Sequence, residues 1–279
     1  MGIVLGIDIG GSTTKICGFR SAGELIQPLS VKADDPISSV YGAFGKFTSL
    51  HGITLDQVER VMVTGAGSGY ISENLYGIPT EHVREFDCVG LGGQYLAKLD
   101  EAIVVSMGTG TALVHVKGDH MAYLGGTGVG GGTLFGLSES MLDVRDMNVL
   151  ETLAETGDIS KVDLRISDIS KKDLSPTLDL DTTASNFGKL SDLATREDLA
   201  LGIINMVFET IGMISVFAAR GFEIRDVVLT GKLSSMKKAR SVFGKLGKMF
   251  NMNFIFPENS RYGTVIGAAL LHFHKLRNC

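Results

Sequence analysis

A glycine turn near the N-terminus is flanked by side chains that could bind a phosphate and a metal ion. The sequence there is Asp8-Ile9-Gly10-Gly11-Ser12-Thr13-Thr14-Lys15. Glycine lets the backbone approach closely, so that its N–H groups can converge on phosphate oxygens. Ser12 and Thr13 add hydroxyl donors, Lys15 offers a positive charge, and Asp8 offers a hard oxygen to Mg²⁺, directly or through water. The turn predicts a phosphate site, although a simple β-hairpin also requires glycine.

Two further glycine turns follow apolar segments later in the chain. The first is Ser106-Met107-Gly108-Thr109-Gly110-Thr111, and the second is Leu229-Thr230-Gly231-Lys232. Two similar turns from two lobes can face each other across a cleft and hold one polyphosphate between them. Glycine in the last turn would let a flat base pack against the backbone. None of the three is a Walker A motif, because no GK[ST] opens a helix here.

The elements that must position these turns follow one pattern twice. Apolar segments at residues 3–9, 14–19 and from Leu25 onward predict three strands joined by turns. Residues 102–107, 112–116 and 121–124 repeat that order. The interval of about 100 residues favours two related lobes over a solenoid, whose repeats are about 20–50 residues long. We expect an N-terminal lobe of residues 1–100 and a C-terminal lobe of residues 101–279.

Other segments complete the predicted elements. The predicted helices are residues 36–51, 68–76, a segment after the third glycine cluster that ends near Ser140, 196–220, 237–250 and 263–276. The further predicted strands are residues 58–63, 227–230 and 254–256. Residues 152–185 are polar and mixed, which predicts connections and short helices. The segment 196–220 is apolar nearly all round, so it is expected to be buried, in the fold or in a subunit interface.

Composition excludes several classes of protein. The 279 residues are 44% hydrophobic and 20% charged, with 36 glycines and a net charge of -5. Disorder, a coiled coil and a collagen-like fibre do not fit, and the acidic balance argues against nucleic-acid binding. No run of 18 apolar residues predicts a membrane span, and the first residues lack the features of a signal peptide. Cys17, Cys88 and Cys279 are scattered without a CxxC pair, as reduced thiols of a soluble cytoplasmic protein would be.

The order of the three glycine turns resembles that of the actin, sugar-kinase and Hsp70 superfamily. A closer resemblance, almost end to end, is to the type II pantothenate kinases. The matching segments are GIDIGGSTTK at 6–15, REFDCVGLGG at 84–93, SMGTGT at 106–111, GGTGVGGGTLFGL at 125–137, GDISKVDLRISDIS at 157–170 and SNFGKL at 185–190. The resemblance implies an α/β, two-lobed, actin-like ATPase fold in which each lobe is a mixed β-sheet flanked by helices. It also implies a homodimer.

The resemblance assigns the general base to Glu85, which on its own would be interpreted as a solvated surface carboxylate. A carboxylate can take the proton of a primary hydroxyl as that hydroxyl attacks the γ-phosphorus. The residues that the resemblance places around ATP and Mg²⁺ are Asp8, Ile9, Gly10, Gly11, Ser12, Thr13, Thr14, Lys15, Thr109, Gly110, Gly131, Gly132, Thr133, Leu134, Phe135, Met147, Gly231 and Lys232. Glu85, Thr109 and Tyr123 would contact the acceptor. A helix that begins at the 131–135 loop would aim its N-terminal dipole at phosphate.

Three positions depart from the family pattern. Tyr123 stands where members usually have an arginine that contacts the pantothenate end of the acceptor. A tyrosine cannot form the charged, bidentate pair that arginine makes with a carboxylate. Met147 stands where bacterial members have a tyrosine near the nucleotide, and Lys232 replaces a serine after the glycine of the third turn.

The sequence therefore predicts an ATP-dependent pantothenate kinase that makes 4′-phosphopantothenate, the first step towards coenzyme A. One alternative is the same chemistry on another small hydroxylated acceptor, such as pantetheine or a sugar. Another is a non-catalytic sensor of nucleotide or coenzyme A. A fourth possibility is an ATP-driven activator of 2-hydroxyacyl-CoA dehydratases, but the iron–sulfur cluster of such proteins needs grouped thiolates, and the three cysteines are scattered.

Overall fold

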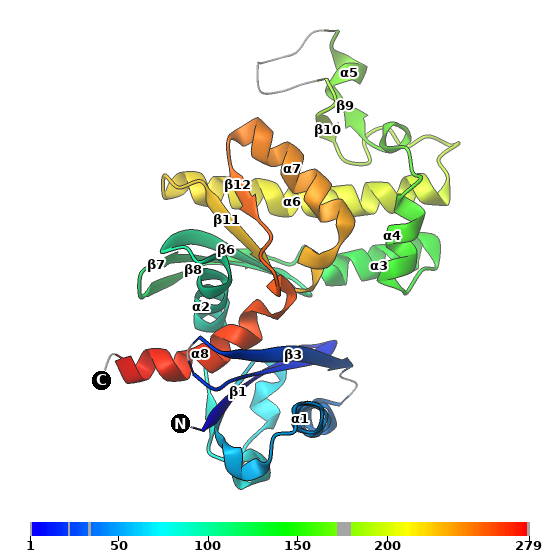
Figure 1. Cartoon of the computed structure of the whole chain (residues 1–279). Coiled ribbons are helices and arrows are strands. Elements are labelled where there is room, and N and C mark those ends of the chain that lie inside the picture. The colour runs from blue at the N-terminus through cyan, green and yellow to red at the C-terminus, as the bar shows by residue number, and fades with distance from the viewer. Residues whose placement is uncertain (1, 22, 33–34, 172–179, 278–279) are drawn as a thin grey trace.

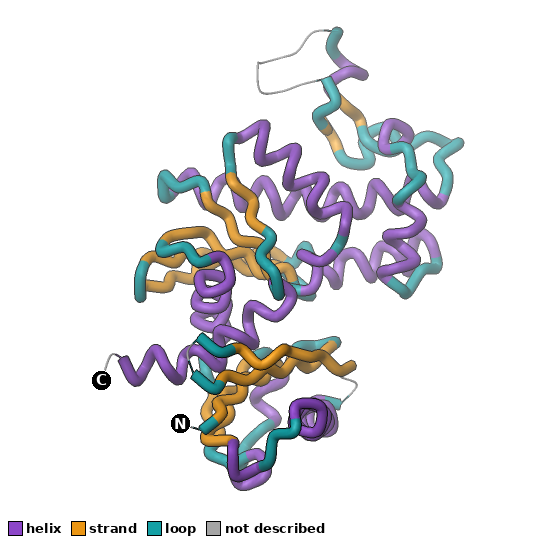
Figure 2. The backbone as a smooth tube through the Cα atoms, in the orientation of Figure 1, coloured by secondary structure: helices purple, strands orange, loops and turns teal. Residues whose placement is uncertain are grey.

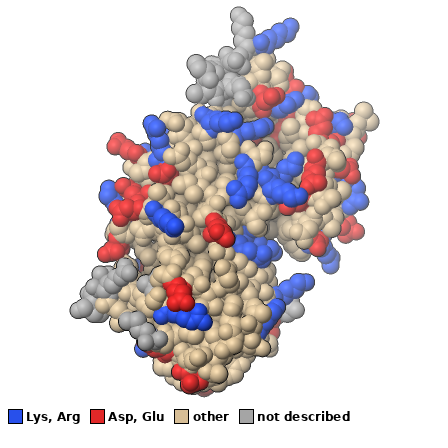
Figure 3. Space-filling model, in the orientation of Figure 1, with Lys and Arg blue, Asp and Glu red and all other residues tan. Residues whose placement is uncertain are grey.

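The structure is a computed structural model that describes residues 2–21, 23–32, 35–171 and 180–277, so Cys279 lies outside the described residues. Within these residues, two five-stranded mixed sheets lie one above the other, with helices α2 (Glu85–Ala97) and α8 (Gly263–Arg277) between them (Figure 1). The two-lobed α/β architecture predicted from the sequence is confirmed. Acidic and basic side chains are both spread over the face shown in Figure 3.

The first sheet has the strand order β3-β2-β1-β4-β5. Its strands are β1 (Ile3–Ile9), β2 (Thr13–Phe19), β3 (Leu25–Lys32), β4 (Val58–Thr64) and β5 (Thr80–His82). The first three strands are antiparallel, whereas β4 and β5 run parallel to β1. Helix α1 (Pro36–His51) packs on one face, and α8 packs on the other.

Alternation along β1 decides which residues face the interior between the sheets. Ile3, Leu5, Ile7 and Ile9 belong to the apolar cluster on the α1 side, whereas Val4 belongs to the cluster on the α8 side. Successive side chains of a strand point to opposite faces of the sheet. Asp8 therefore lies on the face that α8 covers.

The second sheet repeats this topology in the order β12-β11-β6-β7-β8. Its strands are β6 (Glu101–Met107), β7 (Thr111–Lys117), β8 (His120–Thr127), β11 (Asp226–Thr230) and β12 (Asn253–Ile255). Here too the first three strands are antiparallel and the last two run parallel to the first. Helix α2 packs on one face, and the other face contributes to a large apolar core with α3 (Gly131–Leu142), α4 (Met147–Ala154), α6 (Arg196–Gly221) and α7 (Lys237–Phe250).

Helices α2 and α8 each follow one sheet and pack on the other. They cross so closely that their contact requires glycine. A Cβ added at Gly92 of α2 would lie 1.9 Å from the carbonyl oxygen of Gly263, and one at Gly267 of α8 would lie 1.9 Å from that of Cys88. The predicted lobe boundary at residue 100 stays a prediction, because β6 begins at Glu101 while α2 and α8 both cross to the opposite sheet.

Helix α6 is the one helix of the described residues that is long and apolar enough to cross a membrane by length and composition alone. Its most apolar window is 56% buried inside the fold. Thr195 caps its N-terminus by accepting a hydrogen bond from the amide of Asp198. The predicted helix 196–220 thus matches α6 to within one residue, and it packs in the core of the second sheet.

A small extension stands at the far end of α6 in Figure 1. It consists of β9 (Leu164–Arg165), α5 (Ile166–Ile169) and β10 (Thr183–Ser185). The buried carboxylate of Asp163 anchors it by accepting hydrogen bonds from the amide of Phe187 and the side chain of Asn205, at 2.8 and 2.9 Å. The predicted mixture of connections and short helices at residues 152–185 agrees with this, except that residues 172–179 lie outside the described part.

The segment between β4 and β6 differs from what the sequence predicted (Figure 2). Residues 68–76, expected to be a helix, form two separate 3₁₀ turns at Ala66–Tyr70 and Leu75–Gly77. Tyr76 has a φ of 53°, which breaks any regular helix there. Strand β5 and helix α2 were not predicted, and α2 proves central because it begins at Glu85.

Candidate active site

Asp8 and Lys15 form an ion pair at the end of the first hairpin. They lie directly opposite each other in the antiparallel register of β1 and β2, so their side chains share one face. Lys15 Nζ lies 3.0 Å from Asp8 Oδ2, and the two side chains are only 13% and 8% exposed. Because both side chains are shielded from water, this charge-assisted hydrogen bond is stronger than an ion pair on the open surface.

The turn between these strands presents its backbone to solvent. The amide of Gly10 donates to the carbonyl of Thr13 at 3.1 Å, and Gly11 and Ser12 are exposed at the tip. Ile9 and Thr14 point to the opposite side of the sheet. Ile9 lies in the core against α1, and the Thr14 hydroxyl hydrogen-bonds Ser39 at 2.8 Å. The side chains of Ile9 and Thr14 therefore point away from the predicted phosphate site, and only their backbone atoms can contribute to it.

Glu85 is the first residue of α2, and its carboxylate shares an electrostatic environment with Asp8 and Lys15. Its side chain still reaches solvent, but the neighbouring protein partly desolvates the carboxylate, and this desolvation is the main cause that raises its pKa. The negative charge of Asp8 raises that pKa further, and the positive charge of Lys15 lowers it. The structure therefore brings Glu85 near an ion pair that belongs to a distant part of the sequence.

Gly65, just after β4, closes the site behind Asp8. Its φ of 91° and ψ of 165° lie in a region open almost only to glycine. An added Cβ would stand 2.6 Å from Asp8 Oδ1. Thr64, which pairs with Asp8 across β1 and β4, is fully buried beside Cys88. The sequence predicts only a strand at residues 58–63 before this segment, and the parallel register of β1 and β4 is what places Thr64 and Gly65 beside Asp8.

The second glycine turn is bonded to the start of α3 through the backbone. The amides of Gly131 and Gly132 donate to the carbonyls of Gly108 and Thr109, both at 2.8 Å. The Thr133 hydroxyl donates to the carbonyl of Gly128 at 3.1 Å, which fixes the entry to the helix. The first two amides of α3 are thus already bonded, so the helix would act on a phosphate mainly through its dipole and its next amides.

The third glycine turn packs on the second. Gly231 has a φ of 86° and a ψ of 176°, and an added Cβ would lie 2.5 Å from the carbonyl oxygen of Met107. Gly108 and Thr109 follow Met107 directly. Leu233, two residues further on, lies near Gly131. The structure thereby joins the second turn, the start of α3 and the third turn into one backbone-lined region, where Leu134 is buried and Phe135 is exposed.

A model of the Fumble family matches residues 99–246, which is more than half of the chain. The chain belongs to the Fumble family. This is the family of type II pantothenate kinases, as the sequence predicted. Type II pantothenate kinases from several strains of Staphylococcus aureus, among them USA300 and MRSA252, are 28% identical over 278 residues. The match covers 96% of this chain and 98% of theirs.

Solved structures support the fold assignment. The activator of the 2-hydroxyisocaproyl-CoA dehydratase from Clostridium difficile, solved with ADPNP, has a TM-score of 0.69 at 16% identity, covering 99% of this chain and 96% of its own. Component A of the (R)-2-hydroxyglutaryl-CoA dehydratase from Acidaminococcus fermentans has a TM-score of 0.70 at 18% identity, covering 99% and 100%. A ROK hexokinase from Thermus thermophilus has a TM-score of 0.56 at 12% identity, covering 98% and 99%. At these identities the likeness concerns the fold alone.

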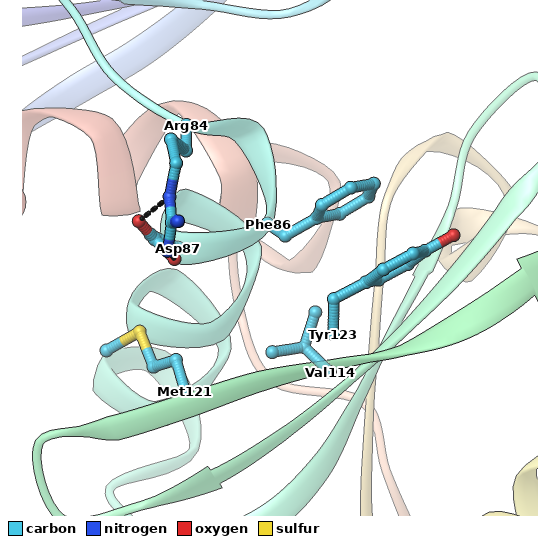
Figure 4. A pocket seen from close by; sticks show the side chains of 6 residues that line it. All are labelled: Arg84, Phe86, Asp87, Val114, Met121 and Tyr123. Atoms are coloured by element: carbon cyan, nitrogen blue, oxygen red, sulfur yellow. Dashed lines mark hydrogen bonds and ion pairs between the residues drawn. The ribbon is translucent and has the colours of Figure 1, made fainter.

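The positions where this Fumble protein departs from the family pattern lie in different surroundings. Tyr123, on β8, stacks against Phe86 of α2, with ring centroids 3.7 Å apart (Figure 4). Met147 begins α4 and packs, partly buried, against the core of the second sheet. Lys232 is exposed at the start of the 3₁₀ turn that follows Gly231. Of the three, Tyr123 lies beside the helix turn that carries Glu85.

Proposed function

We propose that the protein is an ATP-dependent kinase that transfers a phosphoryl group to the primary hydroxyl of pantothenate and yields 4′-phosphopantothenate, the first step towards coenzyme A. The observation that carries this proposal is the convergence of Asp8, Lys15 and Glu85 at one end of the first hairpin. The curated relatives are named type II pantothenate kinases, and the dehydratase activator was solved with a bound ATP analogue. Both support ATP as the phosphoryl donor.

In this mechanism Glu85 takes the proton of the acceptor hydroxyl. The hydroxyl oxygen forms a bond to the γ-phosphorus, the bond from that phosphorus to the bridging oxygen breaks, and ADP leaves. Lys15 would leave Asp8 to meet the phosphate charge, and the exposed amides of the first turn would bind phosphate oxygens. The second turn, with Thr109 and Gly110, and the start of α3 would hold the phosphates from the other lobe. Gly231 and Lys232 would border the base.

The residues present fit a magnesium ion held by one carboxylate. Asp8 is buried, and its Oδ2 pairs with Lys15, while Oδ1 points towards the space that Gly65 leaves free. The described residues contain no group of three or more His, Cys, Asp or Glu side chains that could hold a metal ion. Mg²⁺ typically keeps several waters and binds one or two carboxylates together with substrate phosphates. When bound, it would neutralise the charge that develops on the phosphates.

The cysteines favour a kinase over an activator that carries an iron–sulfur cluster. Cys17 and Cys88 are both buried, and Cys17 donates to the carbonyl of Val265. Burial raises the pKa of the Cys88 thiol to about 12 and that of Cys17 higher still. Because the thiolate is the form that binds metal, such thiols are poor ligands.

We also propose that the protein acts as a cytoplasmic homodimer, with the outer face of α6 in the interface. Phe217 is 63% exposed on this helix, and Met206 and Met213 are partly exposed along the same face. Ile203, in contrast, is fully buried within the subunit, so a charge there would disrupt the fold instead of an interface. Sizing chromatography of a Met206→Glu variant tests this, since a dimer of wild-type size would contradict the assignment.

The function itself is tested by ADP release from Mg-ATP with pantothenate, pantetheine and hexoses in parallel, against a reaction without acceptor. Turnover with pantothenate at least tenfold above the control supports the proposal. Turnover with a hexose alone would move the substrate to the sugars while keeping the role of Glu85. ATP binding without turnover on any acceptor would make the protein a nucleotide sensor.

A further inference from the structure

A pocket opens beside the first turn of α2, next to Glu85. Its volume is about 270 Å³, and it is lined by Arg84, Phe86, Asp87, Val114, Met121 and Tyr123. Figure 4 shows the Phe86–Tyr123 pair on one side, Arg84 with Asp87 on the other, and Val114 and Met121 along the floor. Successive residues of a helix project about 100° apart, so Phe86 faces the pocket while Glu85 faces Asp8 and Lys15. A hydroxyl held at Glu85 would therefore belong to an acceptor whose remaining atoms extend into this pocket.

The two aromatic rings form a flat apolar wall. They are stacked with an angle of 10° between their planes and 3.7 Å between centroids. Phe86 is 37% exposed and Tyr123 is 50% exposed, so the pair also leaves apolar surface open to a ligand. Stacked aromatic rings stabilise each other beyond the area that they bury, so the wall is in place before a ligand arrives.

The charged side of the pocket is already neutralised. Arg84 donates from Nε and from a terminal nitrogen to the two carboxylate oxygens of Asp87, at 2.8 and 2.9 Å. Both partners lie in the same helix turn, so the backbone already holds the two side chains within reach of each other. No other cation lines the pocket among the described residues. A ligand carboxylate would meet either the aromatic wall or a guanidinium already occupied by its own carboxylate, and an unpaired charge against an apolar surface is unfavourable.

We propose that the Phe86–Tyr123 pair determines acceptor specificity, and that the acceptor arm that lies against it is uncharged, such as an amide or an aliphatic chain. This rests on the kinase activity proposed above and sharpens it. The acceptor class is a primary alcohol whose far end carries no carboxylate, or one for which the carboxylate brings no advantage. Pantothenate would be phosphorylated, and its neutral amides would be phosphorylated at least as well.

The test compares two acceptors that differ in charge alone, pantothenate and its primary amide. In the wild-type protein we expect kcat/KM for the amide to equal or exceed that for pantothenate. Tyr123→Arg supplies an unpaired guanidinium and should lower the amide-to-pantothenate ratio at least tenfold, because a hydrogen bond to a charged group contributes about 1.5–3 kcal/mol. Tyr41→Arg is the matched control, since Tyr41 is also an exposed tyrosine in an aromatic pair but lies on α1, away from the pocket.

A binding measurement keeps the two proposals separate. The chain has no tryptophan, so Tyr123→Trp places a single fluorescent reporter in the aromatic wall, and Tyr41→Trp places one outside it. Titration with the amide should change the emission at position 123 and leave position 41 unchanged. If no acceptor is phosphorylated, the proposed function fails, and the titration alone then decides whether the pocket binds an uncharged arm. A wild-type preference for pantothenate of tenfold or more, or a ratio unaffected by Tyr123→Arg, would overturn the specificity role while leaving the kinase intact.

Discussion

The two sheets share one topology but carry different chemistry. In each, a three-stranded antiparallel unit is extended by two parallel strands, and the first strand ends in a glycine turn. The registers correspond closely, because Asp8 pairs with Thr64 in the first sheet and Ser106 pairs with Thr230 in the second. The position that Asp8 occupies in the first sheet is thus occupied by Ser106 in the second.

The hairpin turns set which residues lie opposite each other where the first strand of each sheet ends. In the first, Ile9 pairs with Thr14, and in the second, Met107 pairs with Thr111, so the second turn is one residue shorter. As a result Asp8 lies opposite Lys15, whereas Ser106 lies opposite Ala112. A change of one residue in a hairpin moves every later side chain to a new partner and face. In the first sheet, the register that follows this turn places Lys15 opposite Asp8.

The two helices between the sheets also differ in the residue at which each begins. Helix α2 begins with Glu85 beside the first hairpin, whereas α8 begins with Gly263, where an added Cβ would lie 3.1 Å from Thr230. One half therefore presents side-chain charge and the other presents close-packed backbone. In a kinase this division suits a first half that handles phosphoryl transfer and a second half that holds the nucleotide.

The largest effect is expected from Glu85→Gln. Removing the base should lower kcat by about 10²–10⁴-fold with ATP binding retained. Because the pKa of Glu85 is raised, its contribution to stability is fully present below the ordinary pKa of a glutamate and is lost as pH rises through the raised value. The glutamine variant should therefore be no less stable than wild type at pH 7. Steady-state kinetics and thermal unfolding measure the two effects, with the exposed Glu24→Gln as the control; an unchanged kcat would remove Glu85 from the role of base.

The matched glycines Gly65 and Gly231 should be equally intolerant of a side chain. Their backbone angles correspond within about 11°, at φ 91° and ψ 165° against φ 86° and ψ 176°. Alanine at either position should cost about 1–3 kcal/mol for the backbone conformation, with the contact to Asp8 or Met107 adding to this.

Denaturant unfolding measures these losses, and Gly69→Ala is the control because nothing lies within 4 Å of an added Cβ there. The functional consequences should differ between the halves. Gly65→Ala should disturb Asp8 and lower kcat, whereas Gly231→Ala should raise KM for ATP. If both variants changed the same kinetic constant, the first half would not be specialised for phosphoryl transfer and the second half would not be specialised for nucleotide binding.

Glycine also marks the limit of what the sequence could predict. Strands β1 and β6 and helices α1 and α7 were predicted to within a residue, because their apolar periodicity is local. Helix α2 escaped prediction since Gly90, Gly92 and Gly93 are poor helix formers. An added Cβ at Gly92 would meet α8, and one at Gly90 or Gly93 would meet side chains of the second sheet, so the need for these glycines appears only in the packed fold.

The candidate site, too, could be predicted from the sequence only in part. Asp8 and Lys15 stand out in a single motif, and the resemblance to a family singled out Glu85. That these three share one electrostatic environment follows only from the packing of α2. Thr64 and Gly65 carry no chemical signature of their own, so their place behind Asp8 could not be predicted without the strand register.

The pH dependence of turnover should move in opposite directions when the two charges near Glu85 are removed. The base must be ionised, so activity should fall on the acid side as pH drops through the raised pKa of Glu85. Asp8 raises that pKa and Lys15 lowers it. Lys15→Met should therefore shift the acid limb of kcat/KM to higher pH, and Asp8→Asn should shift it to lower pH.

Both variants should also turn over slowly, so the shift must be read from the shape of the profile and not from its height. Arg20→Met serves as the control, because Arg20 pairs with Glu24 at an exposed turn. A shift in the same direction for both variants would mean that a group other than Glu85 titrates in the profile.

The smallest expected effect compares the two buried threonines that end the equivalent strands. The Thr230 hydroxyl donates to the carbonyl of Val105 at 3.2 Å, whereas the Thr64 hydroxyl, beside the Cys88 thiol, makes no hydrogen bond of normal geometry. Thr230→Val should lower the free energy of unfolding by about 0.5–1.5 kcal/mol. Thr64→Val should be neutral or stabilising, because a buried hydroxyl without a partner has already lost its hydration. Urea unfolding measures both changes, provided that the m-value is unchanged. An equal loss of stability for Thr64→Val would show that the Thr64 hydroxyl is hydrogen-bonded in solution. The two halves would then be more alike than their contacts indicate.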